Sequence, residues 1–264
     1  MHLPALPLRK FQRLCGLAAP ALGALLLAGC AAVGPGPADT PFKPLTLHIA
    51  HINDHHSQLD GFAGTELTLG GVATQVDLGG FARQTALFKS LAGKPNLLKL
   101  HAGDALTGSL YYTFFKGKAD AQMMNTICFD AFIPGNHEFD DGDATLKSFL
   151  DALAQGPCKT PTLSANIVVE PGSPLAPTGA APYLQPSLVK VVDGVRVGLV
   201  GITIAGKTKA SSRPLPGTRL LDEATSAQAA IDTLTAQGVR HIVLMTHQGF
   251  EADQALAARL TDVD

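Results

Sequence analysis

The chain has 264 residues, of which 46% are apolar and 16% are charged, and it therefore has enough apolar side chains for a full-sized globular core. This composition excludes an intrinsically disordered protein. The formal net charge of -2, without any block of like charges, argues against a nucleic-acid polymer as a partner, because such binding requires clustered Lys and Arg. The length predicts one large domain or two small ones.

The first thirty residues have the pattern of an export signal. Arg9, Lys10 and Arg13 form a positively charged head, and an apolar stretch follows at 14–28. That stretch is shorter than the ~20 residues that a membrane-spanning helix needs. We therefore assign residues 1–29 to a signal peptide and exclude them from fold reasoning.

The end of this segment resembles the lipobox of bacterial lipoproteins, because residues 27–30 have the sequence Leu-Ala-Gly-Cys. The resemblance implies that Cys30 becomes the N-terminus and carries a diacylglyceryl group, which anchors the exported protein to a membrane. Ala31 after the Cys, in place of Asp, points to the outer membrane, facing the periplasm. The alternative is an ordinary signal peptide with a chance Cys.

Residues 30–44 are rich in Pro, Gly and Ala and have no apolar periodicity. Such a composition is typical of a flexible tether. The folded domain is therefore expected at 45–264.

The domain is predicted to alternate strands and helices, which indicates an α/β fold. Strands are expected at 45–52 (buried on both faces), 96–101, 131–133, 162–166 and 241–246, and helices at 80–91, 119–126, 144–154, 223–237 and 252–260. A Pro-rich loop at 171–186 precedes a predicted hairpin, 188–192 with 195–204, which turns at Asp193-Gly194. No internal repeat is visible.

Four short polar segments follow predicted strands, and such loops meet at the carboxyl ends of sheet strands. They are Asn-Asp-His-His at 53–56, Gly-Asp at 103–104, Gly-Asn-His-Glu-Phe-Asp at 135–140 and Thr-His-Gln-Gly at 246–249. Carboxylate, imidazole and amide oxygen together suit divalent metals such as Zn or Mn. Asp54 and His56 stand at i and i+2, so in extended backbone both side chains point the same way and can hold one ion.

Each segment also has a structural interpretation. Gly-Asp alone is a common turn, a lone His after a strand is usually a satisfied polar residue, and Asn-His-Glu can form a turn and helix cap. The metal interpretation depends on four such loops in order, each after an apolar strand.

Together these segments resemble the calcineurin-like metallophosphoesterases. Gly-Gly-Phe-Ala-Arg-Gln at 79–84 and Ser-Ala-Asn at 164–166 narrow the resemblance to the catalytic domain of bacterial 5'-nucleotidases and UDP-sugar hydrolases. The similarity covers essentially all of 45–264. It implies a metallophosphoesterase-type αββα sandwich, incomplete at the C-terminus, that hydrolyses phosphate esters of nucleotides or nucleotide sugars.

The resemblance further implies a dinuclear centre of two divalent ions, Zn, Mn or similar. By this resemblance Asp54 and His56 hold the first metal, Asn136 and His247 hold the second, and Asp104 bridges them. A metal-activated hydroxide would then attack phosphorus in line.

His137 and Asp140 resemble the catalytic pair of the family. An imidazolium at His137 would stabilise charge on the phosphoryl and leaving oxygens, and Asp140 would orient it. A separation of i and i+3 makes the two residues neighbours on one helical turn.

Three other polar residues near these segments are given structural roles. His101 ends a predicted strand, and His55 lies between two implied ligands and should point the opposite way. Glu138 is expected to pack or cap instead of binding metal.

Cys128 and Cys158 are expected to form a disulfide, because an exported protein folds in an oxidising compartment. Closing a loop of that size stabilises a domain by ~3 to 4 kcal/mol in the chain-entropy account. Metal-binding or catalytic thiols are the alternative, but neither Cys lies in a Cys-x-x-Cys or His-rich context.

One part of the family pattern has no counterpart in the sequence. After an Asp-Val-Asp of the kind at 262–264, the pattern continues into a Gly-His-x-His or Gly-His-x-Gln loop and then a C-terminal nucleotide-binding domain. Five of the seven implied ligand residues are therefore present, and we expect little or no turnover from this polypeptide. A fragment or a truncated product is the favoured explanation, and a genuine short protein with weakened metal binding is the alternative.

Two other functions stay open. A SoxB-like thiosulfohydrolase would hydrolyse sulfur-linked sulfate on the same scaffold, and an inactive surface lipoprotein would bind a ligand or partner without catalysis. Metal content separates an enzyme from the second of these, because the enzyme requires about two ions per chain.

Overall fold

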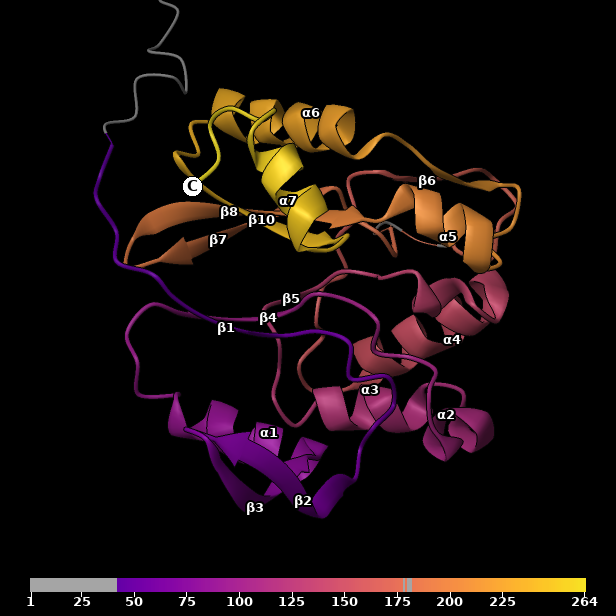
Figure 1. Ribbon diagram of the computed structural model, residues 1–264. Helices are drawn as coiled ribbons and strands as arrows, with labels where there is room; N and C mark the ends of the chain where they lie inside the picture. Colours follow the sequence, from indigo (N-terminus) through magenta and orange to yellow (C-terminus); the bar gives the residue numbers. More distant parts are fainter. Residues whose placement is uncertain (1–41, 178, 180–181) are drawn as a thin grey trace, which may run out of the picture. The chain divides into compact units, whose positions relative to one another are not determined.

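The structure, a computed structural model, describes residues 42–177, 179 and 182–264 (Figure 1). The predicted signal peptide, the predicted lipidation site Cys30 and the tether up to residue 41 lie outside these residues. The described end of the tether contacts the domain, since Lys43 Nζ donates to the Asp193 carbonyl at 3.1 Å. Within the described ranges, every helix is too short or too polar to cross a bilayer.

Two three-stranded sheets pack against each other at the centre (Figure 1). The first sheet is parallel, in the order β1 (His48–Ile52), β4 (Leu97–His101), β5 (Ala131–Phe132). The second has the order β10 (His241–His247), β8 (Val195–Thr203), β7 (Ser187–Val192), with β10 parallel and β7 antiparallel to β8. Leu98 and Leu100 of the first sheet meet Val197 and Leu199 of the second in one buried apolar cluster.

Helices cover the outer faces of both sheets (Figure 1). On the side of the first sheet lie α1 (Phe81–Ser90), α2 (Leu110–Phe115), α3 (Lys118–Met124) and α4 (Gly142–Gln155). On the side of the second lie α6 (Glu223–Ala236) and α7 (Phe250–Ala257). Outside these layers are α5 (Ala205–Ser211), the 3-10 turn η2 (His137–Phe139), and β6 (Ile167–Val169) paired with β9 (Thr218–Leu220). The predicted α/β sandwich of metallophosphoesterase type is confirmed.

Two predicted strands differ from the structure. The strand expected at 45–52 begins at His48, and its residues alternate between half-buried and exposed because β1 is an edge strand covered on one face. The strand expected at 162–166 is reduced to isolated bridges at Thr162 and Leu163, and the regular strand β6 starts at Ile167. The hairpin at Asp193-Gly194 forms as predicted, with β7 antiparallel to β8.

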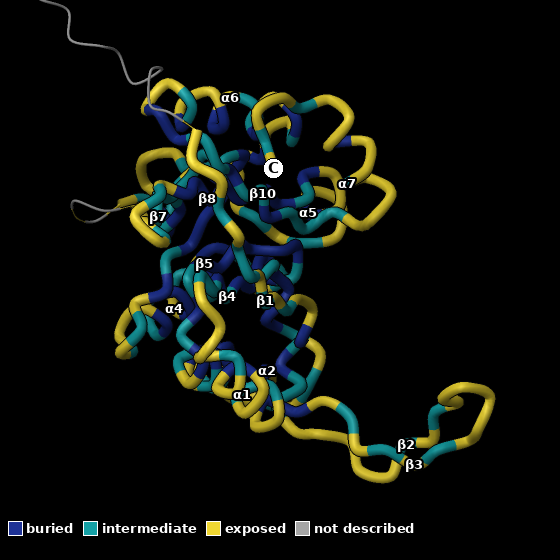
Figure 2. The backbone as a smooth tube through the Cα atoms, turned by 90° about the vertical axis from the view of Figure 1, so that its left-hand side faces the viewer, coloured by how far each residue is buried: buried dark blue, intermediate teal, exposed yellow. Residues whose placement is uncertain are grey.

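A hairpin that the sequence reasoning missed projects away from the sandwich (Figure 2). It consists of β2 (Gly61–Leu69) and β3 (Val72–Gly79), joined at Gly70-Gly71, where φ is 57° and 85°. Positive φ at both turn positions is the geometry that tight hairpins require and that glycine adopts without strain. Most residues of the two strands are exposed, including Phe62 and Val72.

The two cysteines of the domain are joined. Cys128, after α3, forms a disulfide with Cys158, after α4, and their Cα atoms are 5.0 Å apart. The bond links the ends of two helices that pack on the first sheet.

Candidate metal centre

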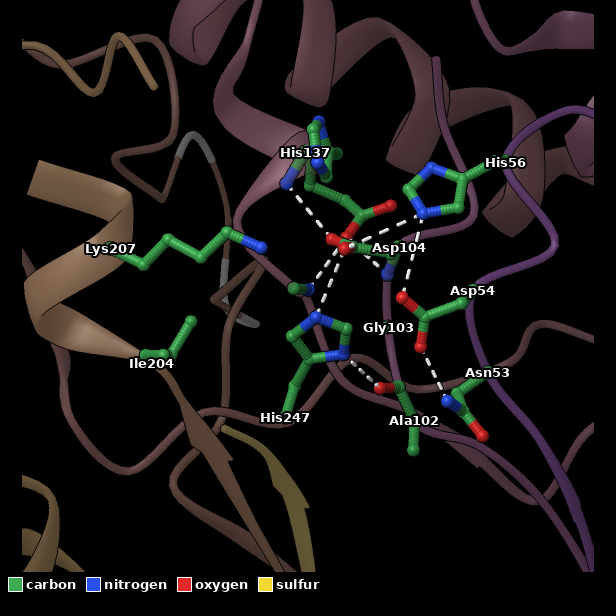
Figure 3. A network of polar contacts seen from close by, with 12 residues as sticks. Asn53, Asp54, His56, Ala102, Gly103, Asp104, His137, Ile204, Lys207 and His247 are labelled. Atoms are coloured by element: carbon green, nitrogen blue, oxygen red, sulfur yellow. Dashed lines mark hydrogen bonds and ion pairs between the residues drawn. The ribbon is translucent and has the colours of Figure 1, made fainter. Parts of the chain in front are cut away.

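The four polar segments meet at the carboxyl ends of β1, β4, β5 and β10 (Figure 3). Main-chain hydrogen bonds hold the first two loops together, with the Asp54 amide donating to the Gly103 carbonyl at 2.9 Å and the His56 amide donating to the Asp104 carbonyl at 3.1 Å. The loops after β4 and β5 also touch, because a Cβ on Gly135 would fall on the Asp104 carboxylate. Glycine is therefore required there.

Three of the implied ligands have left-handed backbone. The φ angle is 51° at Asp54, 47° at His56 and 52° at Asp104. The extended backbone expected for Asp54 and His56 is therefore wrong, although their side chains still meet, with Asp54 Oδ1 3.4 Å from His56 Nε2. Such conformations are uncommon for non-glycine residues and persist where the surrounding structure over-determines them, often at functional sites.

Asp104 is the centre of the constellation (Figure 3). It is 1% exposed, and its Oδ2 lies 3.0 Å from His247 Nε2 and 3.8 Å from His56 Nε2. Its Oδ1 accepts the His137 amide at 2.9 Å. A carboxylate that faces imidazoles from two separate loops can serve as a bridge between two cations.

The imidazoles at this centre share one orientation. His56 Nδ1 lies 3.3 Å from the Leu106 carbonyl and His247 Nδ1 lies 2.7 Å from the Ala102 carbonyl, so each Nδ1–H donates to main chain. The Nε2 atoms of both rings then face Asp104, and each can offer a lone pair to a metal when its ring is neutral. A metal-binding His typically donates its other N–H to a carbonyl or carboxylate in this way, which fixes the tautomer and the ring orientation.

The electrostatics of the pair formed by Asp104 and His247 indicate a place for a cation. Burial lowers the pKa of His247, but the Asp104 carboxylate outweighs this effect and raises it to about 9. Burial likewise acts to raise the pKa of Asp104, yet the hydrogen bond and charge of His247 lower it overall. The proton held between them occupies a position that a divalent ion would take instead, because a ligand imidazole binds metal in its neutral form.

Asn136 provides a direct test of whether the residues fit a metal. The residue is 1% exposed, and neither Oδ1 nor Nδ2 has a hydrogen-bond partner among the described residues. Buried amides are rarely left unpaired, and a bound ion is one of the few explanations. The amide oxygen is a suitable neutral ligand, so the donor set fits a divalent cation.

The ligand atoms divide into two groups that share Asp104. His56, Asp104 and His137 form one group and Asp54, Asp104 and His247 form the other, with all ligand atoms of a group within 4.8 Å of one another. Asp54 and His56 therefore fall in different groups, whereas the family resemblance assigns both of them to one metal. The sharing of Asp104 agrees with a bridging role.

Glu138 has the structural role expected for it. The side chain is 1% exposed, and its carboxylate accepts the amides of Gly135, Asp104, Ala105 and Leu106 at 2.6 to 3.1 Å. Burial and the nearby Asp104 raise the pKa of Glu138 to about 7, against the effect of these donors. The carboxylate thereby fastens the loop after β5 to the loop after β4.

His137 and Asp140 lie together at the two ends of η2. His137 Nδ1 is 2.6 Å from Asp140 Oδ2, and Ser212 Oγ donates to Asp140 Oδ1 at 2.9 Å. The contact with Ser212 was not predicted, because 72 residues separate it from Asp140 and no motif surrounds it. The carboxylate is thus fixed from both sides and orients the imidazole.

A cavity of about 750 Å³ opens beside the centre. Its lining includes Asn53, Asp54, Asn136, Lys207, His247 and Phe250. Figure 3 shows the Lys207 side chain extending from α5 toward Asp104. The volume lies within the range of small-molecule sites. Lys207 and Phe250 were missed by sequence reasoning, because neither stands in a motif, and only their positions shortly after β8 and β10 could have indicated them.

Comparison with protein families gives one match over most of the chain. The family model described as calcineurin-like phosphoesterase matches residues 47–251. This range contains every residue implied as a metal ligand and both members of the His137–Asp140 pair.

The chain is 40% identical over 223 residues to the NAD 5'-nucleotidase of Haemophilus influenzae, covering 84% of this chain and 35% of that protein. A solved structure of NAD nucleotidase from Haemophilus influenzae superposes with a TM-score of 0.75 at 40% identity, over 83% of this chain and 41% of the other. The sulfate thiohydrolase SoxB of Thermus thermophilus superposes with a TM-score of 0.67 over 85% of this chain and 48% of its own. Its identity of 19% shows a shared fold alone. The chain thus spans about a third of the length of the curated relative.

Proposed function

The chain belongs to the calcineurin-like phosphoesterase family, and from this premise we propose that its metal centre hydrolyses phosphate esters of nucleotides. The observation that carries the proposal is the convergence of imidazoles from two loops on buried Asp104. Beside them lies the Asn136 side-chain amide, which has no hydrogen-bond partner in the described part of the chain. The relative named NAD 5'-nucleotidase supports the substrate class.

We propose that two divalent cations, Zn, Mn or similar, are held by these residues, since members of the family use divalent metals. Asp54 and His56 would hold one, Asn136 and His247 the other, and Asp104 both. When bound, such ions supply Lewis acidity that polarises a phosphoryl group and lowers the pKa of water. The left-handed loops hold the ligands in place before any ion arrives, which reduces the cost of ordering them.

His137 would stabilise charge on the phosphoryl group and on the leaving oxygen. Its Nδ1–H donates to Asp140, so the carboxylate orients the ring. The Nε2 atom is the one that would give a proton to the leaving alcohol. Asp140 is held in turn by Ser212, so the pair keeps its orientation without substrate.

The cavity would take the nucleotide beside the phosphoryl site. Lys207 lines it and makes no ion pair with any described residue, so its ammonium is available to an anionic substrate. A cavity of about 750 Å³ has room for a nucleoside monophosphate.

The test measures release of inorganic phosphate from AMP by the purified full chain, with and without Mn²⁺. UDP-glucose is tested in parallel, and there a phosphatase releases phosphate from the hydrolysis products. We expect metal-dependent release that chelation abolishes, because the proposed ligands Asp54, His56, Asp104, Asn136 and His247 are present. Release that persists in chelator, or a chain that binds no metal, would contradict the proposal.

Two further measurements on the same purified chain distinguish the two alternatives. Sulfate release from a sulfur-linked sulfonate, without phosphate release from nucleotides, would favour a thiosulfohydrolase. A chain that lacks bound metal and both activities would instead be a non-catalytic binding protein.

We also propose that the protein is exported and anchored through lipid on Cys30, on the basis of the sequence alone. Mass spectrometry of the N-terminal peptide from membranes would detect the acyl groups. A Cys30→Ser variant that stays in the membrane fraction as strongly as the unchanged protein would contradict this assignment.

A further inference from the structure

A chain of three buried polar side chains lies behind the loops that carry the metal ligands. His101 is fully buried at the end of β4, His55 is 6% exposed after β1, and Asp120 is fully buried in the first turn of α3. His101 Nε2 is 2.9 Å from His55 Nδ1, and His55 Nε2 is 3.2 Å from Asp120 Oδ1. None of the three faces the cavity beside the metal centre.

The hydrogen bonds among these three side chains run in one direction. The Gly103 amide can only donate, so His101 Nδ1 accepts it, at 3.2 Å. Burial lowers the pKa of His101, so its ring is neutral and carries its proton on Nε2, which donates to His55 Nδ1. His55 then carries its proton on Nε2 and donates it to the Asp120 carboxylate. Each tautomer is therefore fixed by its neighbour.

Apolar rings enclose the chain and keep the hydrogen bonds away from water. Phe81 packs edge-on against His55 at 5.2 Å between ring centroids. Phe129 and Phe132 pack edge-on against His101 at 5.2 and 5.3 Å. In such surroundings an unpaired polar group is costly, so the three side chains hold one another in a single arrangement.

The two ends of this row of hydrogen bonds show what the three side chains can do. One end is the Gly103 amide, in the loop that presents Asp104, and His55 in the middle stands between Asp54 and His56. This row of hydrogen bonds ends at a peptide N–H and not at a side chain of the site, so it cannot deliver a proton to substrate. It connects both ligand loops to α3.

We propose that Asp120, His55 and His101 are positioning residues that hold the left-handed loops of Asp54, His56 and Asp104 in metal-binding geometry. The expected effect on metal affinity rests on the proposed function. The rigidity of the two loops can be measured without metal. The anchor is Asp120, because it is the carboxyl group at the end of this row of hydrogen bonds opposite the Gly103 amide.

Asp120→Ala removes the anchor, whereas Asp120→Asn keeps an oxygen that accepts from His55. In chelated protein, we expect Asp120→Ala to speed amide hydrogen exchange in segments 53–57 and 102–106. We expect it to weaken Mn²⁺ binding, followed by calorimetry, by ~10 to 100-fold, the usual loss for residues behind metal ligands. Asp120→Asn should stay within about 3-fold of the unchanged protein, since it retains the hydrogen bond.

Asp143 provides the matched control. It is also fully buried in the first turn of a helix, α4, and it accepts from Ser173 Oγ at 3.1 Å and the Leu215 amide at 3.0 Å. These partners lie on loops that carry none of the implied ligands. Asp143→Ala should lower the unfolding temperature without faster exchange in the two ligand loops and without loss of Mn²⁺ affinity.

If Asp120→Ala does not fold, the double variant His55→Leu with Asp120→Leu replaces both partners of the His55–Asp120 pair by apolar groups. It leaves only the neutral His101 N–H without an acceptor, which a buried site tolerates better than an unpaired charge. It should show the same fast exchange and weak Mn²⁺ binding. Unchanged exchange in the ligand loops, or equal changes in Asp143→Ala, would overturn the proposal. If the unchanged chain binds no Mn²⁺, the proposed function fails, and the exchange data alone decide on the positioning role.

Discussion

The metal centre has a buried half and an open half. Asp104 and Asn136 belong to the buried half, where each residue is 1% exposed and the Glu138 carboxylate fastens the surrounding amides. Asp54 belongs to the open half, where its side chain is 45% exposed and its Oδ2 accepts from the neighbouring Asn53 side-chain amide. β1 and β10, which lead into Asp54 and His247, are both edge strands.

The two halves differ in how firmly the fold holds their ligands. A buried carboxylate is held by donors that cannot rearrange without leaving unpaired groups, and this rigidity reduces the ordering cost of metal binding. An exposed carboxylate interacts with a cation through water of high dielectric and contributes less. The buried half should therefore dominate metal affinity.

Asp104→Ala should have the largest effect. It removes the only carboxylate shared by both groups of ligand atoms, so we expect loss of both ions and a fall in phosphate release of at least about 10²-fold. Metal content of the purified variant, measured by mass spectrometry, checks this result. Retention of two ions would show that the buried half does not hold them.

His137→Ala should rank next in activity and should leave metal binding intact. Loss of a positioned acid typically costs ~10² to 10⁴ in rate. Steady-state kinetics together with the Mn²⁺ content separate this effect from ligand loss. Release of Mn²⁺ by the variant would instead identify His137 as a ligand, in agreement with its place beside His56 and Asp104.

Asp54→Asn tests the open half directly against Asp104→Asn, because both changes remove one charge and keep an oxygen. We expect Asp54→Asn to weaken Mn²⁺ binding by only ~10-fold, since solvent screens this carboxylate. Calorimetric titration of both variants provides the comparison. A larger loss for Asp54→Asn than for Asp104→Asn would reverse the ranking of the two halves.

The disulfide should have the smallest effect on the centre. Replacing Cys128 and Cys158 by Ser should lower the free energy of unfolding by ~3 to 4 kcal/mol, because the unfolded chain gains loop entropy. Denaturant unfolding measures this change. Mn²⁺ affinity should not move, since the bond joins the chain after α3 to the chain after α4 and does not involve Asp120 in the first turn of α3. A changed affinity would mean that this link also positions the ligand loops.

The sequence predicted the layers and the chemistry of the ligand loops better than their backbone. Apolar strands followed by Asp, Asn and His indicate a sheet edge with metal chemistry, and all four segments do meet there. The left-handed φ at Asp54 and His56 could not be predicted, because it depends on main-chain bonds to Gly103 and Asp104, about fifty residues away in the sequence.

Asp120 and Ser212 were missed by sequence reasoning because their partners are distant in the chain. Asp120 acts through His55, 65 residues before it, and Ser212 acts through Asp140, 72 residues before it. The projecting hairpin of β2 and β3 was missed for a different reason. Its apolar alternation is short: in β3, half-buried Thr74, Val76 and Leu78 alternate with exposed residues, and most other positions of the two strands are exposed.

The most direct test of the metal centre is a crystal structure of the Mn²⁺-loaded chain with anomalous diffraction data. The account predicts two anomalous peaks on either side of the Asp104 carboxylate, one beside Asp54 and His56 and the other beside Asn136 and His247. A structure at saturating Mn²⁺ with no peak at Asp104, or with Asn136 facing away from every peak, would contradict it.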